Sequence, residues 1–312
     1  MATTAIANAN SPARALTEHI DMPDSTAPGS LTNALTIDVE DYFQVSAFAP
    51  HIKRSEWNSR ECRVERNVGR ILEMLSANKT KATFFTLGWI AERYPQLIRQ
   101  IAAQGHEIAS HGYGHERASD LTEDAFFADI QLAKVILEDL CGTEVKGYRA
   151  PSFSIGAGNL WAFDCLARAG YRYSSSVYPI RHDHYGMPES PRFAYSVRPG
   201  LVEIPVTTLR ALGRNLPSSG GGYFRLLPYV LSRWMLRRVN TGDQQPGIFY
   251  FHPWEIDVAQ PRIEGISNKT RFRHYVNISR MEGKLEQLLA DFKWGRMDEV
   301  FRHSIAGGAA VA

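Results

Sequence analysis

Three histidines lie close together in the segment HEIASHGYGH, residues 106–115. His111 and His115 are four positions apart, and this spacing lets two imidazoles converge on one ion from a helical turn or a compact loop. His106 lies within an apolar run, so we interpret it as a structural residue that supports the other two. Two histidines at this spacing also occur by chance, so further partners must come from elsewhere in the chain.

Two carboxylates follow an earlier apolar run, in the segment TIDVEDYF. Asp38 and Glu40 are two positions apart, so their side chains leave the same face of an extended backbone. Asp41 points elsewhere unless the strand has already ended. Taken alone, the pair also fits the solvated edge of a strand.

Two further reactive side chains each follow an apolar run. Arg149 lies in GYRAPSF, where Pro151 stiffens the turn, and His252 lies in YFHPWEID. In parallel α/β folds the chemistry gathers at the carboxyl ends of the strands. Four such motifs, each at the end of a separate strand, therefore indicate one shared site.

The elements that must position these residues alternate between strands and helices. Short runs rich in β-branched residues predict strands over 34–39, 81–88, 106–110, 145–150, 171–177, 201–207 and 247–254. Helical periodicity and capping residues predict helices starting near 64, 95 and 122, and others over 159–170 and 281–292. This alternation predicts a parallel sheet, either open or closed into a barrel. The stretches 181–200 and 210–246 interrupt it and are predicted to be loop-rich insertions near the site.

Composition is ordinary for a globular protein, with 44% hydrophobic and 22% charged residues among 312. A net charge of +2 gives no reason to expect a nucleic acid partner, and three scattered cysteines indicate reduced thiols. We expect a disordered leader over 1–30, one domain over 31–300 and a flexible tail over 301–312. No signal peptide or run of about 18 apolar residues is evident, so we expect a cytoplasmic protein without a transmembrane segment.

Together these motifs resemble the polysaccharide deacetylases of carbohydrate esterase family 4, which share the NodB-homology domain. The order is the same: an acidic motif, TFF, H-x-x-x-H, R-x-P and a late histidine. The spellings DVEDYF, GYRAPSFSI and YFHPWEID are most similar to the subgroup found beside exosortase and exopolysaccharide gene clusters. The resemblance implies a deformed (β/α) barrel of about seven parallel strands. It also implies metal-dependent removal of N-acetyl groups from amino sugars of a polysaccharide or its precursor, in exopolysaccharide biosynthesis, with zinc as the first choice of metal.

The resemblance also implies residue roles. This sequence departs from the family pattern at two positions that bear on these roles. Val39 follows Asp38 where the usual pattern has a second aspartate. Ser174 stands where related sequences commonly have an aspartate that orients the catalytic histidine. Asp41 is therefore a rival ligand, and the group that orients His252 is left open. The implied roles are a base at Asp38, an acid at His252, an arginine at Arg149 that holds the base, and metal ligands at Glu40, His111 and His115.

The substrate that the resemblance implies is an N-acetylated glycan, with a lipid-linked precursor at the inner membrane face as our hypothesis. Aromatic faces near a site can stack on sugars, and PSSGGGYFRLLPY (217–229) has the composition of a lid. A homo-oligomer is left open. The residues expected to contact the glycan are Tyr113, Pro151, Phe153, Tyr223 and Trp254.

Three alternatives remain. A small or cyclic amide hydrolase related to allantoin breakdown would need a compact polar pocket. A carbohydrate-binding relative without turnover has no use for both a base and an acid. A dinucleotide-binding protein would have G-x-G-x-x-G after the first strand, where this chain has EDYFQV.

Overall fold

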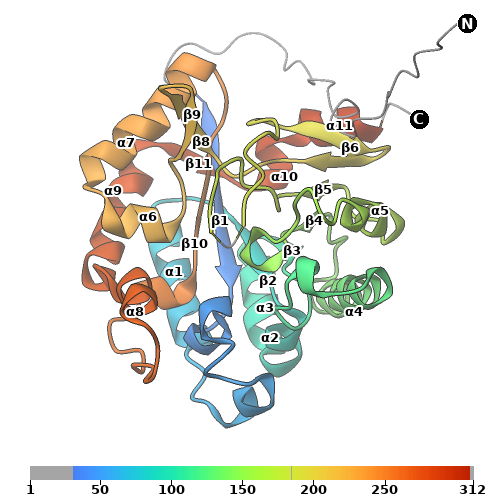
Figure 1. Ribbon diagram of the computed structural model, residues 1–312, viewed down its shortest axis with the longest axis vertical. Helices are drawn as coiled ribbons and strands as arrows, with labels where there is room; N and C mark the ends of the chain where they lie inside the picture. Colours follow the sequence, from blue (N-terminus) through green and yellow to red (C-terminus); the bar gives the residue numbers. More distant parts are fainter. Residues whose placement is uncertain (1–30, 184, 310–312) are drawn as a thin grey trace, which may run out of the picture.

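A computed structural model describes residues 31–183 and 185–309. Its main feature is a curled sheet with the strand order β10-β1-β2-β3-β4-β5-β7-β6, and β11 also pairs with β1 (Figure 1). The pairings from β10 through β7 are all parallel, and β6 runs antiparallel to β7. These seven neighbouring strands confirm the predicted α/β fold. Within the described residues no pairing joins β10 to β6 or β7, so the sheet is an open half-barrel.

The elements have the following bounds. The strands are β1 Thr32–Val39, β2 Thr83–Thr86, β3 Glu107–Ser110, β4 Gly147–Tyr148, β5 Tyr173–Ser174, β6 Tyr195–Arg198, β7 Leu201–Glu203, β8 Thr208–Ala211, β9 Arg214–Pro217, β10 Ile248–Phe251 and β11 Lys293–Gly295. The helices are α1 Val64–Ala77, α2 Gly88–Arg93, α3 Pro95–Ala103, α4 Glu123–Cys141, α5 Trp161–Arg168, α6 Gly221–Leu226, α7 Tyr229–Arg238, α8 Asn268–Tyr275, α9 Met281–Asp291, α10 Met297–Val300 and α11 Arg302–Ala309.

Strand β1 shows why this sequence forms a central strand. Every residue from Asn33 to Val39 is buried. Leu35 and Ile37 belong to the large core cluster shared with the helices, whereas Ala34 belongs to a smaller cluster with Phe85 from the next strand. The face toward the helices is formed by the larger apolar residues Leu35, Ile37 and Val39, and the residues between them are small or polar.

The stretch 210–246 differs from the loop-rich insertion that the sequence predicts. It contains most of the β8–β9 hairpin and both α6 and α7. Leu209 of the hairpin packs with Met235 and Val239, so tertiary contacts rather than a strong local periodicity hold these elements. The other predicted insertion, residues 181–200, contains strand β6 near its end.

The expected flexible tail is wrong for residues 301–309, which include helix α11. Phe301 packs against the inward-facing side chains of the sheet, and the Gly200 N–H donates to the Gly308 carbonyl at 2.7 Å. The glycines that suggest fraying in the sequence allow this close approach: a Cβ on Gly308 would lie 2.4 Å from Val202. The expected leader over 1–30, and residues 310–312, lie outside the described residues.

No helix in the described part of the chain is long and apolar enough to cross a membrane. Strand β1 points downward in Figure 1, toward the segment that follows Val39. Because β2, β3, β4 and β10 run parallel in the same sheet, their carboxyl ends meet at this edge.

Candidate active site

A groove of about 770 Å³ opens at the carboxyl edge of the sheet. All four sequence motifs reach it or its wall. Asp38 ends β1, Glu40 follows that strand, His111 follows β3, and His252 follows β10. The groove is lined by Asp38, Glu40, His111, His115 and His252, together with aromatic side chains that include Phe43, Trp57, Phe153, Tyr185, Tyr250 and Trp254.

Three of these side chains form a candidate metal site. One ligand atom from each of Glu40, His111 and His115 lies within 4.8 Å of the other two. The His115 Nε2 atom is 2.5 Å from Glu40 Oε2, and the two imidazoles face each other with ring centroids 5.3 Å apart. Two histidines and one carboxylate are a donor set that suits zinc and leaves further coordination positions open.

The surroundings of His111 set it up as a ligand. Its Nδ1 atom lies 2.8 Å from the Arg149 carbonyl oxygen, which can only accept, so Nδ1 carries the proton and Nε2 keeps its lone pair. Burial lowers the pKa of His111 to about 4, which keeps the ring neutral. A neutral imidazole is the form that binds a metal.

Glu40 is fixed by a residue from the far end of the chain. The Trp254 indole N–H donates to Glu40 Oε1 at 3.0 Å, which leaves Oε2 directed at His115. Burial alone would raise the pKa of Glu40, but the neighbouring imidazoles, His115 foremost, hold that pKa well below its usual range. Glu40 is therefore an ionised carboxylate inside a buried cluster.

Asp38 is held by a fully buried arginine. Arg149 Nη1 donates to Asp38 Oδ1 at 2.6 Å and to the Thr36 hydroxyl at 2.8 Å. The Arg149 Nε donates to the Ser175 carbonyl at 3.1 Å. Asp38 Oδ2, the oxygen that is not bonded to Arg149, lies 3.9 Å from His252 Nε2.

His252 is oriented by a residue that sequence reasoning missed. The Glu255 carboxylate accepts from His252 Nδ1 at 3.1 Å and from the His252 backbone N–H at 2.9 Å. Burial would lower the pKa of His252, but Glu40, Glu255 and Asp38 raise it to about 9. The sequence does carry a signal for this contact, because Glu255 comes three positions after His252, which is the spacing of a capping box.

Glu255 is in turn paired with Arg225 of α6. The Arg225 Nε donates to Glu255 Oε1 at 2.9 Å, and both side chains are 1% exposed. The Arg225 Nη1 donates to the backbone carbonyls of His274 and Val276 at 2.7 and 2.8 Å. The sequence predicts this segment as a flexible lid, whereas the structure makes it a fixed wall behind His252.

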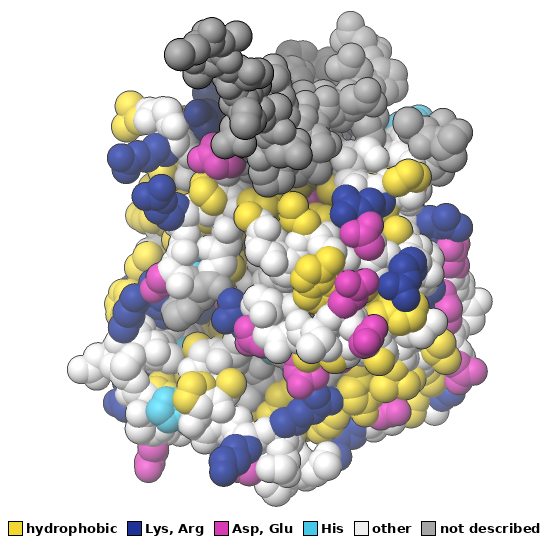
Figure 2. Space-filling view, turned by 45° about the vertical axis from the view of Figure 1, so that its right-hand side comes forward, with side chains coloured by type: hydrophobic (Ala, Val, Ile, Leu, Met, Phe, Trp, Pro, Cys, Tyr) yellow, Lys and Arg dark blue, Asp and Glu magenta, His cyan; other side chains and the backbone are white. Residues whose placement is uncertain are grey.

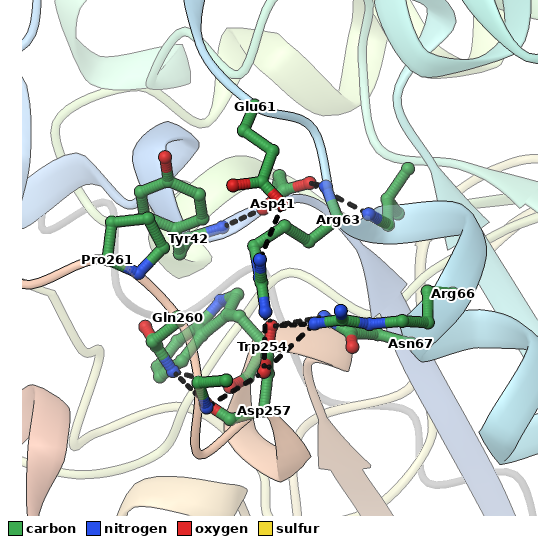
Figure 3. A network of polar contacts seen from close by, with 12 residues as sticks. Asp41, Tyr42, Glu61, Arg63, Arg66, Asn67, Trp254, Asp257, Gln260 and Pro261 are labelled. Carbon is green, nitrogen blue, oxygen red and sulfur yellow. Dashed lines mark hydrogen bonds and ion pairs between the residues drawn. The ribbon is translucent and has the colours of Figure 1, made fainter.

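The rival ligand Asp41 lies outside the metal cluster. Its Oδ1 accepts from the Tyr42 N–H at 2.8 Å, and its Oδ2 accepts from the N–H groups of Arg63 and Val64 at 2.5 and 2.8 Å. Cys62 Sγ donates to the same oxygen at 3.1 Å. Figure 3 shows Asp41 beside Arg63, which pairs with Asp257. Asp41 therefore fixes the start of α1, and it does not belong to the candidate metal cluster.

The other predicted residues divide between the groove and the rest of the molecule. Phe153 and Trp254 line the groove, and Pro151 lies beside the lining residue Ser152. Tyr113 instead donates its hydroxyl to Glu92, and Tyr223 lines a separate small cavity. These two predictions of substrate contact are not supported, because aromatic type alone does not say which way a side chain points.

His106 lies at the opposite end of β3 from His111. Its Nδ1 accepts from the Ala82 N–H at 3.1 Å, and its ring contacts Phe84 at 5.1 Å between centroids. It is a structural residue of the sheet, and it makes no contact with the two ligand histidines.

Backbone strain gathers at the groove. Three lining residues that are not glycine have positive φ values: His115 at 56°, Ser152 at 54° and Phe153 at 50°. Such conformations cost about 1–3 kcal/mol each and often mark functional sites. Here they turn an imidazole and a phenyl ring toward the same groove.

The comparisons with known proteins agree with this architecture. Residues 60–174 match the family described as polysaccharide deacetylase, and residues 175–302 match a domain of unknown function, DUF3473. A peptidoglycan-N-acetylglucosamine deacetylase of Bacillus cereus is 37% identical over 30% of this chain and 34% of its own length. A chitooligosaccharide deacetylase of Azorhizobium caulinodans is 34% identical over 33% of this chain and 48% of its own length. The chain thus matches between a third and a half of the length of these curated relatives.

Solved structures share the fold over most of the chain. A proposed polysaccharide deacetylase from Mycobacterium smegmatis superposes with a TM-score of 0.60, covering 94% of this chain and 96% of that chain at 21% identity. The PuuE allantoinase superposes with a TM-score of 0.57, and the match covers 93% of this chain and 99% of the allantoinase chain at 17% identity. Both likenesses concern the fold.

Proposed function

Because the chain belongs to the polysaccharide deacetylase family, we propose that it hydrolyses the N-acetyl groups of amino sugars in a glycan. The observation that carries this proposal is the approach of Asp38 and His252, 3.9 Å apart in one groove, beside a cluster of two histidines and a carboxylate. A base and an acid that converge on one position suit amide hydrolysis, in which water must lose a proton and the amine must gain one.

Glu40, His111 and His115 would hold a divalent metal, with zinc as the first choice. A zinc ion at such a site polarises an acyl oxygen and lowers the pKa of water. Glu40 is ionised and His111 is neutral, as metal ligation requires.

The chain's own residues then divide the proton transfers. Asp38 Oδ2 takes a proton from the water while the water oxygen bonds to the carbonyl carbon of the acetyl group. Arg149 holds and orients Asp38 through Oδ1. His252 Nε2 gives a proton to the amide nitrogen as the C–N bond breaks, which releases acetate and a free amine. Glu255 holds the ring through Nδ1, so that Nε2 faces the reaction.

The groove supports a glycan rather than a small amide as substrate. Its volume of about 770 Å³ and its aromatic lining suit several sugar rings, which present apolar faces for stacking. The motif spellings support a role in exopolysaccharide biosynthesis. The substrate that we propose is a lipid-linked precursor at the inner membrane face. Fractionation of native cells tests that location, and a periplasmic protein would refute it.

The runner-up is a small or cyclic amide hydrolase, since an allantoinase shares the fold. The deciding experiment measures acetate release from N-acetylglucosamine oligomers and, in parallel, hydrolysis of allantoin, each with and without a chelator. We expect acetate release that the chelator abolishes and added zinc restores. Allantoin hydrolysis without acetate release would favour the runner-up. A protein that binds the oligomers but turns over neither substrate would favour the carbohydrate-binding alternative.

A further inference from the structure

The exposed apolar side chains of this protein are concentrated on one surface. Ten large hydrophobic residues are exposed in the described part of the chain, and six of them lie between positions 212 and 234. Isolated exposed leucines are common, but a concentration of this kind marks an interaction site. The six are Leu212, Leu216, Leu226, Val230, Leu231 and Trp234.

Helix α7 presents its outer face within this group. Val230 and Trp234 are four positions apart, so they share one face of the helix, and they are 73% and 53% exposed. The opposite face is buried through Met235 and Leu236. The β8–β9 hairpin, whose tip residue Leu212 is 99% exposed, lies beside α7 in Figure 1 and packs on it through Leu209. We call the six apolar residues, with the arginines of α7 and the hairpin, the α7 surface.

The charged residues that the segment 204–242 contributes to this surface all have the same sign. Residues 204–242 contain six arginines and no aspartate, glutamate or lysine, whereas the whole chain has nearly equal numbers of basic and acidic residues, 35 and 33. Arg225 is buried with Glu255, and Arg233 pairs with Asp291 at 3.2 Å. The ion pairs of the described residues include no carboxylate partner for the other four, which are Arg210, Arg214, Arg237 and Arg238.

Helix α4 provides the contrast. It also exposes two apolar residues, Leu132 and Val135. Its sequence, EDAFFADIQLAKVILEDLC, carries five acidic residues and one lysine. On the face turned forward in Figure 2, acidic and basic side chains are interspersed among the hydrophobic ones. An exposed apolar pair therefore occurs elsewhere, but not together with an excess of arginine.

We propose that the α7 surface docks on an anionic lipid bilayer. Tryptophan and aliphatic side chains insert at the boundary between headgroups and acyl chains, and arginines contact the lipid phosphates. A surface with arginines and no carboxylates among 204–242 matches a uniformly negative partner. Docking does not depend on the proposed deacetylation, because none of the six apolar residues lines the groove.

The experiment is co-sedimentation of the full chain with vesicles of phosphatidylcholine alone or mixed with phosphatidylglycerol. We expect binding to the mixed vesicles only, weakened by salt. The double variants Val230→Ser/Trp234→Ala and Arg237→Glu/Arg238→Glu should each weaken binding by about tenfold or more. The matched control Leu132→Ser/Val135→Ser removes a similar pair from α4 and should bind as the wild type does.

Thermal unfolding of each variant confirms that it is folded before binding is compared. Absence of wild-type binding to anionic vesicles at low salt would overturn the proposal. Binding that the α7 variants leave unchanged would also overturn it, since the contact would then lie elsewhere. Self-association of the wild type that the α7 variants abolish, without vesicle binding, would assign the surface to a second copy of the chain instead.

Discussion

At the scale of single residues, the orientation of His252 has a local solution. Ser174 is buried and donates to the Ser176 hydroxyl at 2.8 Å, so it does not serve the catalytic histidine. Glu255 binds both the ring Nδ1 and the backbone N–H of His252. A carboxylate three positions along the same turn therefore holds this imidazole.

The Glu255→Gln variant tests this role. Glutamine keeps an acceptor but loses the charge that favours the protonated ring, so we expect kcat to fall by about 10–100-fold. KM and bound zinc should change little, because Glu255 does not belong to the metal cluster. The control is Glu73→Gln on the exposed side of α1. A Glu255→Gln enzyme with unchanged kcat would contradict the role.

Substitutions of the adjacent residues Asp41 and Glu40 should have opposite effects on zinc binding. Asp41→Ala removes the acceptor of several buried donors, so the free energy of unfolding should fall by about 1–3 kcal/mol while zinc binding is retained. Glu40→Gln should lose zinc. Denaturant unfolding and metal analysis of both variants check this, and loss of zinc from Asp41→Ala would restore Asp41 as the ligand.

At the scale of elements, helix α6 forms the wall behind the catalytic histidine. A Cβ on Gly221 would lie 1.9 Å from Glu255 Oε2, whereas nothing lies within 4 Å of a Cβ on Gly222. The carboxylate packs directly on the α6 backbone. The glycine-rich segment therefore packs against Glu255 instead of standing apart from the site as an open loop.

The adjacent glycines provide a matched pair of variants. Gly221→Ala should displace Glu255 and lower kcat by about tenfold or more, since losing a group that orients a neighbouring functional side chain has an effect of this size. Gly222→Ala should keep full activity and raise stability by up to about 1 kcal/mol, because alanine favours a helix over glycine. Steady-state kinetics and thermal unfolding separate the two. Equal activity in both variants would show that the wall has no catalytic role.

Elements with strong local signals could be predicted from the sequence. Thr122 caps α4, accepting from the Ala125 N–H, and Gly142 ends that helix with φ of 67°, as their residue types indicate. Helices α6, α7 and α11 could not be predicted in the same way. They are short, and contacts with distant segments, such as that of Gly308 with Gly200, hold them.

The candidate site was predictable to a similar extent. Asp38, Glu40, Arg149 and His252 follow strands whose carboxyl ends must meet in a parallel sheet. The contacts of Glu255 and Trp254 with the site depend on the path of the turn after β10. No periodicity in the sequence encodes that path.

At the scale of the whole molecule, the two family regions form one sheet. β5 of the first region pairs with β7 of the second, and β10 of the second pairs with β1, which precedes the first region. His111 and His115 lie in the first region and His252 lies in the second. The site is therefore complete only when both regions are folded together.

Glu203 lies at the junction of these regions, and its ionisation should make the stability of the protein depend on pH. Its carboxylate accepts from the N–H groups of Ser176 and Val177 at 2.9 and 2.8 Å. Burial raises its pKa from 4.5 to about 7. The folded state thus keeps a proton that the unfolded chain releases, so stability should fall as pH rises from about 4.5 to about 7 and then level off.

The Glu203→Gln variant should remove this contribution to the decline. Between pH 5 and pH 8 the wild type should lose more stability than the variant, by on the order of 1–3 kcal/mol. Denaturant unfolding at both pH values measures the difference. The exposed Glu286→Gln variant on α9 should behave as the wild type does. Identical pH slopes for wild type and Glu203→Gln would contradict the assignment.

The central claim is that Asp38 is the base beside a metal held by other residues. The most direct test measures bound zinc and acetate release from N-acetylglucosamine oligomers in the same samples of wild type, Asp38→Asn and His115→Ala. We predict that the wild type binds zinc and releases acetate. Asp38→Asn should keep zinc but lose at least about 100-fold in rate, and His115→Ala should lose zinc. Full activity in Asp38→Asn, or a zinc-loaded wild type that releases no acetate, would contradict the account.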